Sequence, residues 1–589
     1  MKAKPGAAGP QERPSGPKAA ARPRRTTRTK PQRSEAVDTD LLTLSDRRIH
    51  EPQRLAVSRD GMVATAHYCA TAAGVEMLEA GGNAFDAAVA AAFALGVCEP
   101  AASGLGGQTM LLVHDATAGR TFALDGSSRA PNRATADAFT DPRAERRRGH
   151  RATTVPSTPA VLDYVRATYG TLPLSDVLQP AVRLAESGYE VSLLQHALTR
   201  REVQFLRDGT AAPFFLRDGR RPYRAGEVFR QPALGATLRR LAEHGIADFY
   251  QGEIAAAIEA DMERHDGFLR SDDLAQIPMP IERRPLTGRL FGHRVFTMPP
   301  PGAGQALVEM MNIHQHLPEA RRGLDSRDGA VLFAETIRRA FLDRADRPFD
   351  PNFYSQVTEK RMLRDDYAHE LAAAIGKRYL GRGETTHLSV MDRAGNAVAL
   401  TQSIENVYGA CAATPELGFL YNNYMSAFEY KDISHPYYMR PNAVPWASVA
   451  PAIVFRGRRP LLAIGSPGSE RIAPSILQVL IRLLHDRAAP LDAVTAPRLF
   501  CSLSGRVSLE ASRMRDDLPR AFEKRGFTVD LREPFSFYLG CVQLVVRDRR
   551  ELIGVADPRR DGAAGGPRRA VRDPDGVARD VTAATKAGA

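Results

Sequence analysis

The chain has 589 residues, of which 43% are hydrophobic and 25% are charged. This composition is typical of a globular protein, and the length exceeds what one simple core supports, so we expect two layers or two subdomains. No apolar run reaches the roughly 20 residues of a membrane-spanning helix, which argues against a membrane partner. The five cysteines are scattered and lack metal-ligand spacing, so we expect no metal and no cofactor.

The net charge of +12 is concentrated at the amino terminus. Up to Ser34 there are ten basic residues and one acidic residue, a net +9, which leaves +3 for the remainder. A nearly balanced body argues against a nucleic-acid partner. Segment 1–50 is rich in Pro, Gly, Ala and Arg, and we expect it to be a disordered basic tail. It contains no apolar signal-peptide core, which predicts a cytoplasmic protein.

From residue 61 onward, apolar runs and turn residues predict alternating strands and helices. The expected strands are 61–66, 110–113, 121–124 and 294–298, and the expected helices are 70–80, 84–97, 176–187, 232–244, 254–265, one from about 305, 325–345 and 360–375. The alanine-rich helix 84–97 should be buried inside a layered body. The glycine-rich turn at 103–107 lacks the lysine of a P-loop, so it predicts close backbone packing rather than nucleotide binding.

The segment 385–403 is predicted to form a β-hairpin. Apolar residues at strand spacing stand on either side of an Asp-Arg-Ala-Gly-Asn turn, namely Leu388, Val390, Val398 and Leu400. If Met391 faces Ala397 across this turn, the same register brings Ser403 opposite Thr385. Directly opposed residues share one face of a sheet, with Cβ atoms roughly 5 Å apart. Two hydroxyl groups are therefore expected to meet at the end of the hairpin.

Thr385 would become a nucleophile if the chain were cut between Glu384 and Thr385. A hydroxyl needs an adjacent base, and an α-amine freed at the same residue, with a pKa of about 7.7–8.0, can be that base. Segment 376–383 is glycine-rich and basic, and it offers the flexibility that a cleavage site requires. Alternatively, two adjacent threonines are simply strand formers, and the hairpin alone favours that interpretation.

Beyond the hairpin, the expected strands are 419–421, 449–455, 461–464, 507–509, 527–529 and 542–546, with a long loop at 430–445 and a loose tail at 563–589. The turn 465–469, Gly-Ser-Pro-Gly-Ser, precedes an amphipathic helix at 471–485. Free N–H groups at such a helix start suit an oxyanion or a phosphate. The same kind of turn also occurs for helix capping alone.

Seven stretches, in this order, together resemble the γ-glutamyltranspeptidase family of N-terminal-nucleophile hydrolases, over about residues 56–562. They are Glu-Ala-Gly-Gly-Asn-Ala-Phe-Asp-Ala-Ala at 79–88, Gly-Leu-Gly-Gly at 104–107, Met-Pro-Pro-Pro at 298–301, Thr-Thr-His-Leu-Ser-Val at 385–390, Gly-Asn-Ala-Val at 395–398, Gly-Ser-Pro-Gly at 465–468 and Ala-Asp-Pro-Arg at 556–559. The resemblance implies an α/β (α+β) fold, a four-layer αββα sandwich. It also implies a precursor that cuts itself into a large subunit, 51–384, and a small subunit, 385–562, which remain associated as a heterodimer.

The resemblance also implies roles for individual residues. Thr385 would be both the autocleavage residue and the acyl-accepting nucleophile, with its own α-amine as general base. The hydroxyl that steadies the nucleophile would be that of Ser403, in agreement with the hairpin register. The oxyanion would be bound by the backbone N–H groups of Gly468 and Ser469, and backbone donors tolerate a changed side chain.

The positions that bind the α-amino acid head of a γ-glutamyl group depart from the family pattern. The replacements are Ser127 for an arginine, Glu405 for an asparagine, Tyr424 and Ala427 for two acids, and Ala447-Ser448 for a Ser-Ser pair. Arg129 lies two residues beyond Ser127 and would share its face if the strand persists. A buried ammonium left without its counter-charges costs several kcal/mol. We therefore expect the catalytic half to be kept and the glutamyl specificity to be lost.

The leading hypothesis is a self-cleaving threonine amidohydrolase or acyltransferase. Its acyl donor would be a small molecule with a terminal carboxylate but no α-amine, held by Arg129, and its acceptor would be water or an amine. The resemblance also allows cleavage of an activated C–C bond, as in some relatives from antibiotic pathways. One alternative is a true glutathione hydrolase or γ-glutamyltransferase in which Glu405 binds the ammonium. Another is an inactive scaffold whose basic tail binds a partner.

Overall fold

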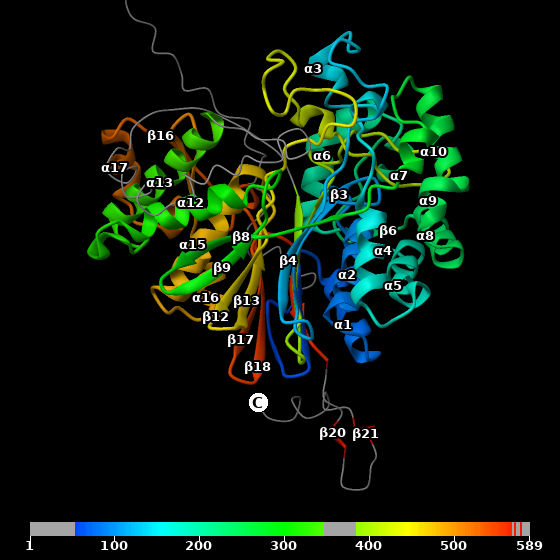
Figure 1. Ribbon diagram of the computed structural model, residues 1–589. Coiled ribbons are helices and arrows are strands. Elements are labelled where there is room, and N and C mark those ends of the chain that lie inside the picture. Colours follow the sequence, from blue (N-terminus) through cyan, green and yellow to red (C-terminus); the bar gives the residue numbers. More distant parts are fainter. Residues whose placement is uncertain (1–52, 347–384, 568–570, 573–577, 580–589) are drawn as a thin grey trace, which may run out of the picture. The chain divides into compact units, whose positions relative to one another are not determined.

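The computed structural model describes residues 53–346 and 385–567 together with two short strands near the carboxyl end. Two seven-stranded sheets lie face to face, with helices on the outer side of each (Figure 1). This arrangement is the predicted αββα sandwich. The basic tail at 1–50, the helix at 360–375 and the cleavage segment at 376–384 lie outside the described residues.

Sheet I contains the predicted hairpin at its centre. Its strands, in spatial order, are β19 (Ala563–Gly565), β2 (Gly61–Thr65), β10 (Thr386–Asp392), β11 (Ala397–Ser403), β3 (Gln108–Asp115), β4 (Arg120–Gly126) and β7 (Ile281–Arg283). All neighbouring strands in this sheet are antiparallel. Residues 563–565, expected to belong to a loose tail, instead form β19, which pairs with β2 at the edge of the sheet.

Sheet II packs against sheet I. Its strands, in spatial order, are β1 (Leu55–Ser58), β18 (Glu551–Ala556), β17 (Gln543–Asp548), β13 (Arg459–Gly465), β12 (Ala452–Arg456), β9 (His293–Thr297) and β8 (Leu286–Leu290). Small and flexible apolar side chains fill the space between the sheets, among them Ala64, Met110, Met391, Ala399 and Ala463. Such side chains let the two sheets approach closely.

The outer helices are positioned by their caps and apolar faces. Sheet I is covered by α1 (Tyr68–Glu79), α2 (Ala84–Cys98), α4 (Thr158–Tyr169) and α5 (Leu174–Ser187), and sheet II by α12 (Gly304–Gln315), α13 (Arg327–Asp346) and α15 (Ile472–Leu484). Gly81, with a φ of 89°, follows the end of α1, and the Asn83 side chain caps α2 by accepting from the N–H groups of Phe85 and Asp86. The predicted burial of α2 is confirmed, since nearly every residue in it is buried.

The remaining elements complete the layers. The other helices are α3 (Pro142–Glu145), α6 (Leu193–Asp208), α7 (Ala212–Phe215), α8 (Pro232–His244), α9 (Ala247–Gln251), α10 (Glu253–Arg264), α11 (Ser271–Ala275), α16 (Pro490–Thr495) and α17 (Leu518–Lys524). Small sheets are formed by β14 (Leu499–Cys501), β15 (Arg506–Leu509) and β16 (Thr528–Leu531), by β5 (Tyr189–Glu190) with β6 (Val228–Phe229), and by β20 (Val571–Arg572) with β21 (Ala578–Arg579). The strand expected at 419–421 is wrong, because Leu420 and Tyr421 make only isolated bridges.

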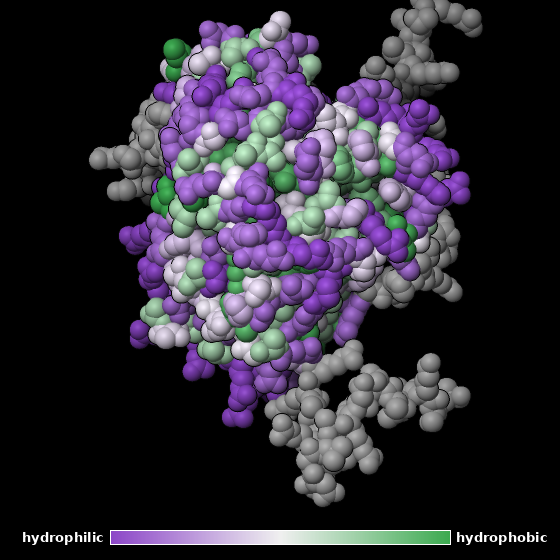
Figure 2. Space-filling view, turned by 90° about the vertical axis from the view of Figure 1, so that its right-hand side faces the viewer, coloured by the Kyte–Doolittle hydropathy of each residue, from purple (hydrophilic) through white to green (hydrophobic). Residues whose placement is uncertain are grey.

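The surface on the side of α8 to α10 is mainly hydrophilic, with apolar residues dispersed over it (Figure 2). Within the described ranges, no helix combines the length and the apolar character needed to cross a bilayer.

Candidate active site

The register of the hairpin matches the prediction. Met391 lies opposite Ala397, and Thr386 lies opposite Gln402. The ladder between β10 and β11 ends at this second pair, and one step further the same register would set Thr385 opposite Ser403. Both residues are buried, at 3% and 1% exposure. Both hydroxyl-bearing residues lie at this end of the hairpin, and direct contact between the two hydroxyl groups stays a prediction.

Thr385 and Ser403 lie on the face of sheet I that packs on sheet II. Side chains alternate between the two faces of a strand. Met391 and Ala399, which differ from Thr385 and Ser403 by even numbers of residues, contribute to the core between the sheets. Leu388 contributes to the core beneath α1 and α2. The pair of hydroxyls is thus at the rim of the inter-sheet space.

Gln108 extends this polar row onto β3, and sequence reasoning missed it. It pairs directly with Ser403. Its Oε1 accepts hydrogen bonds from the N–H and the hydroxyl of Ser128, at 2.8 and 2.9 Å, which fixes the orientation of the amide. Its Nε2 is buried and, among the described residues, has no acceptor in hydrogen-bonding geometry. The amide therefore directs a donor toward Ser403 and the neighbouring Tyr424 hydroxyl.

Glu405 and Tyr424 both lie next to Ser403. The N–H of Glu405 donates to Ser403 Oγ at 2.9 Å, and Glu405 has a φ of 77°, which is uncommon for a residue with a side chain. Tyr424 is fully buried, and its hydroxyl lies beside Ser403 and Gln108. Burial, followed by the charge of Glu405, raises the pKa of Tyr424. The tyrosine is therefore a neutral hydroxyl at neutral pH.

Arg129 and Ser448 stand apart from this group. Strand β4 ends at Gly126, so the condition under which Arg129 would share the face of Ser127 is not met. The Arg129 guanidinium is partly exposed and donates to Asn442 Oδ1 at 3.5 Å. Ser448 is half-buried on the segment leading into β12. Within the part of the chain that the structure describes, neither side chain hydrogen-bonds Thr385, Ser403, Glu405 or Tyr424.

The turn 465–469 approaches Thr385 from sheet II. Strand β13, which ends at Gly465, contacts β10 and β11 across the inter-sheet space. A Cβ atom placed on Gly465 would lie 2.2–2.5 Å from three ring atoms of His387, two residues beyond Thr385. Only glycine allows this approach, so the two sheets meet closely at the end that carries Thr385.

His387 is a neutral ring that supports this contact. Its Nδ1 lies 2.9 Å from Thr401 Oγ1 and its Nε2 lies 3.1 Å from Ser389 Oγ. Because Ser389 donates to the carbonyl of Gln543, it accepts from Nε2, which places the ring proton there. Burial lowers the pKa of His387 to about 3. The sequence motif Thr-Thr-His contains this residue, but its role depends on a contact between the sheets.

The turn presents two backbone donors at the start of a helix. Gly468 has a φ of 120° and Ser469 has a φ of 54°, and the short helix Ser469–Arg471 leads into α15. No described residue accepts a hydrogen bond from the N–H of Gly468 or Ser469. Adjacent free N–H groups at a helix N-terminus can stabilise an oxyanion.

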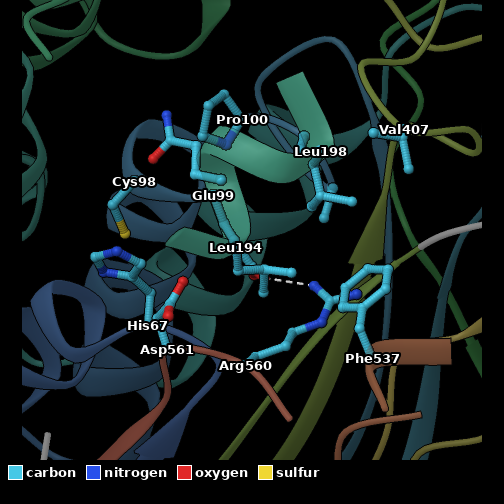
Figure 3. Close-up of a pocket in the computed structure, with 13 residues that line it drawn as sticks. His67, Cys98, Glu99, Pro100, Leu194, Leu198, Val407, Phe537, Arg560 and Asp561 are labelled. Atoms are coloured by element: carbon cyan, nitrogen blue, oxygen red, sulfur yellow. Dashed lines mark hydrogen bonds and ion pairs between the residues drawn. The ribbon is translucent and has the colours of Figure 1, made fainter. Parts of the chain in front are cut away.

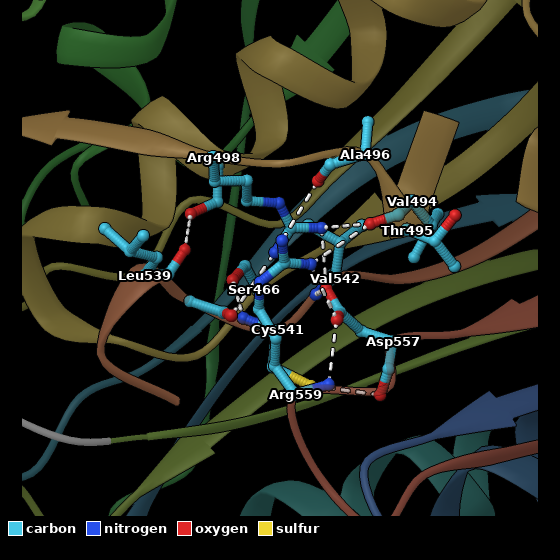
Figure 4. Close-up of polar contacts among 12 residues, drawn as sticks. Ser466, Val494, Thr495, Ala496, Arg498, Leu539, Cys541, Val542, Asp557 and Arg559 are labelled. Atoms are coloured by element: carbon cyan, nitrogen blue, oxygen red, sulfur yellow. Dashed lines mark hydrogen bonds and ion pairs between the residues drawn. The ribbon is translucent and has the colours of Figure 1, made fainter. Parts of the chain in front are cut away.

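A buried charge network supports the turn from behind (Figure 4). Asp557 pairs with Arg498 at 2.6 Å and with Arg559 at 3.0 Å, and Arg559 also pairs with Glu510 at 2.7 Å. Although burial opposes ionisation, the two arginines hold the pKa of Asp557 below its usual value. The neighbouring N–H of Cys541 donates to the hydroxyl of Ser466 at 3.0 Å, which anchors the turn to this network.

One cluster outside this site contains metal-type ligands. Asp261 Oδ2 lies 2.9 Å from His150 Nε2 and accepts from Thr414 Oγ1 at 3.0 Å, and Asp261 also pairs with His265. The rings of His150 and His265 are stacked, 4.3 Å apart and inclined by 7°. A metal ion lies in the plane of each imidazole that binds it, and two stacked rings do not share a plane. The cluster fits a hydrogen-bonded structural unit better than a metal site.

Comparisons with known proteins agree with this geometry. The family model described as gamma-glutamyltranspeptidase matches residues 70–566. The chain is 32% identical to the glutathione hydrolase proenzyme of Escherichia coli K12, over 85% of this chain and 91% of that protein. It is 34% identical to the acylase ACY 1 proenzyme of Pseudomonas sp. V22, over 80% and 88%.

A solved structure shows the same fold. The cephalosporin acylase from Bacillus halodurans superimposes with a TM-score of 0.81 at 28% identity, over 92% of this chain and all of that chain. Relatives of both kinds are hydrolases or acylases, and the chain is accordingly an enzyme of the N-terminal-nucleophile amidohydrolase type. On the family match and the shared fold, this chain belongs to the γ-glutamyltranspeptidase family.

Proposed function

We propose that the chain cuts itself between Glu384 and Thr385 and then acts through Thr385 as an amidohydrolase or acyltransferase. The observation that supports this proposal is the register of β10 and β11, which, continued by one residue beyond the pair Thr386 and Gln402, would set Ser403 opposite Thr385. The related proteins from Escherichia coli and Pseudomonas are named proenzymes, which supports processing of this chain as well. The products, 1–384 and 385–589, would remain associated because sheets I and II each contain strands from both pieces.

Each step of the reaction has a group to perform it. The α-amine of Thr385 takes the proton of its own hydroxyl, and the oxygen attacks the substrate carbonyl. The N–H groups of Gly468 and Ser469 stabilise the oxyanion, and the Ser403 hydroxyl orients the nucleophile. The amine returns the proton to the leaving group. Water or an acceptor amine then releases the acyl group from Thr385.

The acyl donor is proposed to bear a carboxylate and to lack an α-amine. Around Ser403, the neutral Tyr424 hydroxyl and the buried amide of Gln108 are hydrogen-bonding groups without charge. An ammonium desolvated there would depend on Glu405 alone. Arg129 stands apart from this group and contacts Asn442, so the proposal requires an acyl chain that extends from Ser403 to the Arg129 guanidinium. The substrate class would then be a carboxylate-bearing acyl amide or an activated C–C analogue.

A second candidate, γ-glutamyl hydrolysis or transfer, is favoured by one observation. Glu405 lies close enough to Tyr424 for its charge to affect the pKa of the hydroxyl, so a carboxylate is available for an ammonium. Turnover of glutaryl-p-nitroanilide and γ-glutamyl-p-nitroanilide separates the two candidates, since only the second compound carries the α-amine. Faster turnover of the γ-glutamyl compound would favour the second candidate.

Self-cleavage is tested first, by denaturing electrophoresis and amino-terminal sequencing of the smaller fragment. We expect two fragments, the smaller beginning Thr385-Thr386-His387. The variant Thr385→Ala should remain intact and inactive, whereas Thr385→Ser should still be cut. An uncut wild-type chain that nevertheless turns over an amide would contradict the proposal, and an uncut chain without activity would indicate a scaffold.

A further inference from the structure

The residue after Thr385 is anchored on the opposite face of sheet I. Thr386 is fully buried, and its hydroxyl donates to Glu99 Oε2. The other carboxylate oxygen of Glu99 pairs with Arg560. The side chains of Arg560 and Glu99 are only 3% and 13% exposed, so this is a desolvated, charge-assisted contact.

The elements that supply this contact are rigid. Glu99 directly follows α2, and its N–H caps that helix by donating to the carbonyl of Leu95. Arg560 follows β18 and is covered by the Phe537 ring, 4.8 Å from its guanidinium carbon (Figure 3). The position of the Glu99 carboxylate is therefore fixed by the end of α2, which carries the residue, and by the ion pair with Arg560. Thr386, on β10, donates a hydrogen bond to this carboxylate.

A small pocket adjoins Glu99 and Arg560 on the side of α2 and α6 (Figure 3). His67 lines it, and because His67 Nδ1 accepts from the N–H of Cys69, the neutral ring carries its proton on Nε2. Among the described residues no acceptor reaches this Nε2. The pocket measures about 20 Å³, enough for about one water molecule rather than a substrate.

Cleavage before Thr385 would remove the covalent restraint on the amino-terminal side of this residue. Thr385 lies outside the ladder, which begins with the pair Thr386 and Gln402. After the cut it would be the free end of a strand, and free ends fray unless they are tied down. The hydroxyl of Thr386 and the carboxylate of Glu99 lie on opposite sides of the cut in sequence, so their hydrogen bond would also hold the two pieces together.

We propose that Glu99 is a positioning residue for the nucleophile. By binding Thr386 it fixes the backbone of Thr385, and with it the directions of the α-amine and the hydroxyl toward Ser403 and the turn 465–469. The ion pair with Arg560 orients the Glu99 carboxylate. This inference rests on the proposed function of Thr385, but it concerns the opposite face of the strand, and neither Glu99 nor Thr386 touches the substrate.

The test compares two substitutions of one side chain. Thr386→Val keeps the shape and removes the hydroxyl, whereas Thr386→Ser keeps the hydroxyl. The control is Thr109→Val, because Thr109 is equally buried, lies in the same row of sheet I, opposite Gln402, and has its hydroxyl 3.0 Å from that of Thr158. The measurements are the rate of self-cleavage on denaturing gels, kcat and KM for glutaryl- and γ-glutamyl-p-nitroanilide, and the thermal unfolding temperature.

We expect Thr386→Val to lower the cleavage rate or the kcat by about tenfold or more with little change in KM, since small misplacement of reacting groups reduces rates strongly. Thr386→Ser and Thr109→Val should resemble the wild type. Glu99→Gln should fall between them, because it can still accept from Thr386 but loses its ion pair with Arg560. Equal rates for Thr386→Val and wild type would overturn the inference, and so would equal losses in Thr386→Val and Thr109→Val.

The same experiment separates this inference from the proposed function. A wild-type chain that is not cut before Thr385 removes the basis of both. A wild-type chain that is cut and active, together with an unaffected Thr386→Val variant, leaves the proposed function standing and removes only the role of Glu99.

Discussion

Two regions of the site are built differently. The proposed catalytic end, comprising Thr385, Ser403 and the turn 465–469, is held by strand pairing and by close contact between the sheets. The proposed acyl wall, comprising Arg129, Glu405, Tyr424 and Ser448, lies on segments outside the strands. Strand register depends on many backbone bonds at once, whereas loop side chains change individually. This difference supports the proposal that the chain keeps the family's catalytic arrangement while changing the residues that would select the acyl group.

The contact between the sheets is the most sensitive part of the catalytic end. We expect Gly465→Ala to abolish self-cleavage or slow it more than about 100-fold, because its Cβ would collide with the His387 ring and displace the turn that carries the oxyanion donors. Denaturing gels over time measure the cleavage. The matched control is Gly323→Ala, since a Cβ there meets nothing within 4 Å. Normal cleavage in Gly465→Ala would show that the turn does not need this contact.

The Ser403 hydroxyl is expected to have the next largest effect. Ser403→Ala removes the acceptor of the Glu405 N–H and the neighbour of the Tyr424 hydroxyl, and it should lower kcat by about 10- to 100-fold. Ser403→Thr keeps the hydroxyl and should remain close to wild type. Steady-state kinetics on the mature protein, with KM measured separately, distinguishes this from loss of binding. A change confined to KM would indicate that Ser403 contributes to substrate binding, as proposed for the acyl wall, rather than to the catalytic step.

The catalytic end should also be sensitive to acid. Burial lowers the pKa of His387 and of His314, on α12, to about 3, whereas an unfolded chain binds those protons near pH 6.5. The unfolded state therefore binds more protons between these values, and stability falls as the pH falls, by about 1.4 kcal/mol per pH unit for each histidine. Urea unfolding at pH 7.5 and 5.5 measures the slope. His387→Gln and His314→Gln should each reduce it, but only His387→Gln should impair cleavage.

The smallest expected effect belongs to the acyl wall. Arg129 is partly exposed and has a long hydrogen bond to Asn442, so Arg129→Gln should raise KM for glutaryl-p-nitroanilide by about five- to tenfold with kcat unchanged. Self-cleavage should be normal. Arg133→Gln is the control, because Arg133 is an exposed arginine nearby that pairs with Asp272 at 2.7 Å. An effect of Arg129→Gln on kcat would mean that the acyl wall and the catalytic end do not act independently.

Much of the fold was predictable because its signals are local. The hydrophobic alternation and the turn defined the hairpin, and its register follows from the pairing of Met391 with Ala397. The helices expected at 70–80 and 84–97 correspond to α1 and α2, and the structure adds the Asn83 cap at the start of α2. The strand expected at 419–421 failed because an apolar run forms a strand only when a neighbouring edge is available, and Leu420 and Tyr421 find only single bridges.

The acyl wall was less predictable. The inference that Arg129 shares a face with Ser127 required β4 to continue, and the strand ends at Gly126. Gln108 has no motif of its own, and its place beside Ser403 depends on which strand pairs with β11. The anchor formed by Glu99 and Arg560 joins residues 461 positions apart.

By itself, the sequence determined the alternation of elements, the hairpin with its register and the glycine turn before α15, since each arises from residues close together along the chain. Only the tertiary structure decided which side chains surround the hairpin and the turn. Examples are the approach of Gly465 to His387, the pairing of Gln108 with Ser403 and the hydrogen bond from Thr386 to Glu99. These contacts depend on how two sheets and their helices pack. Packing brings together residues that are far apart in the sequence, and their separation along the chain does not predict their distance in space.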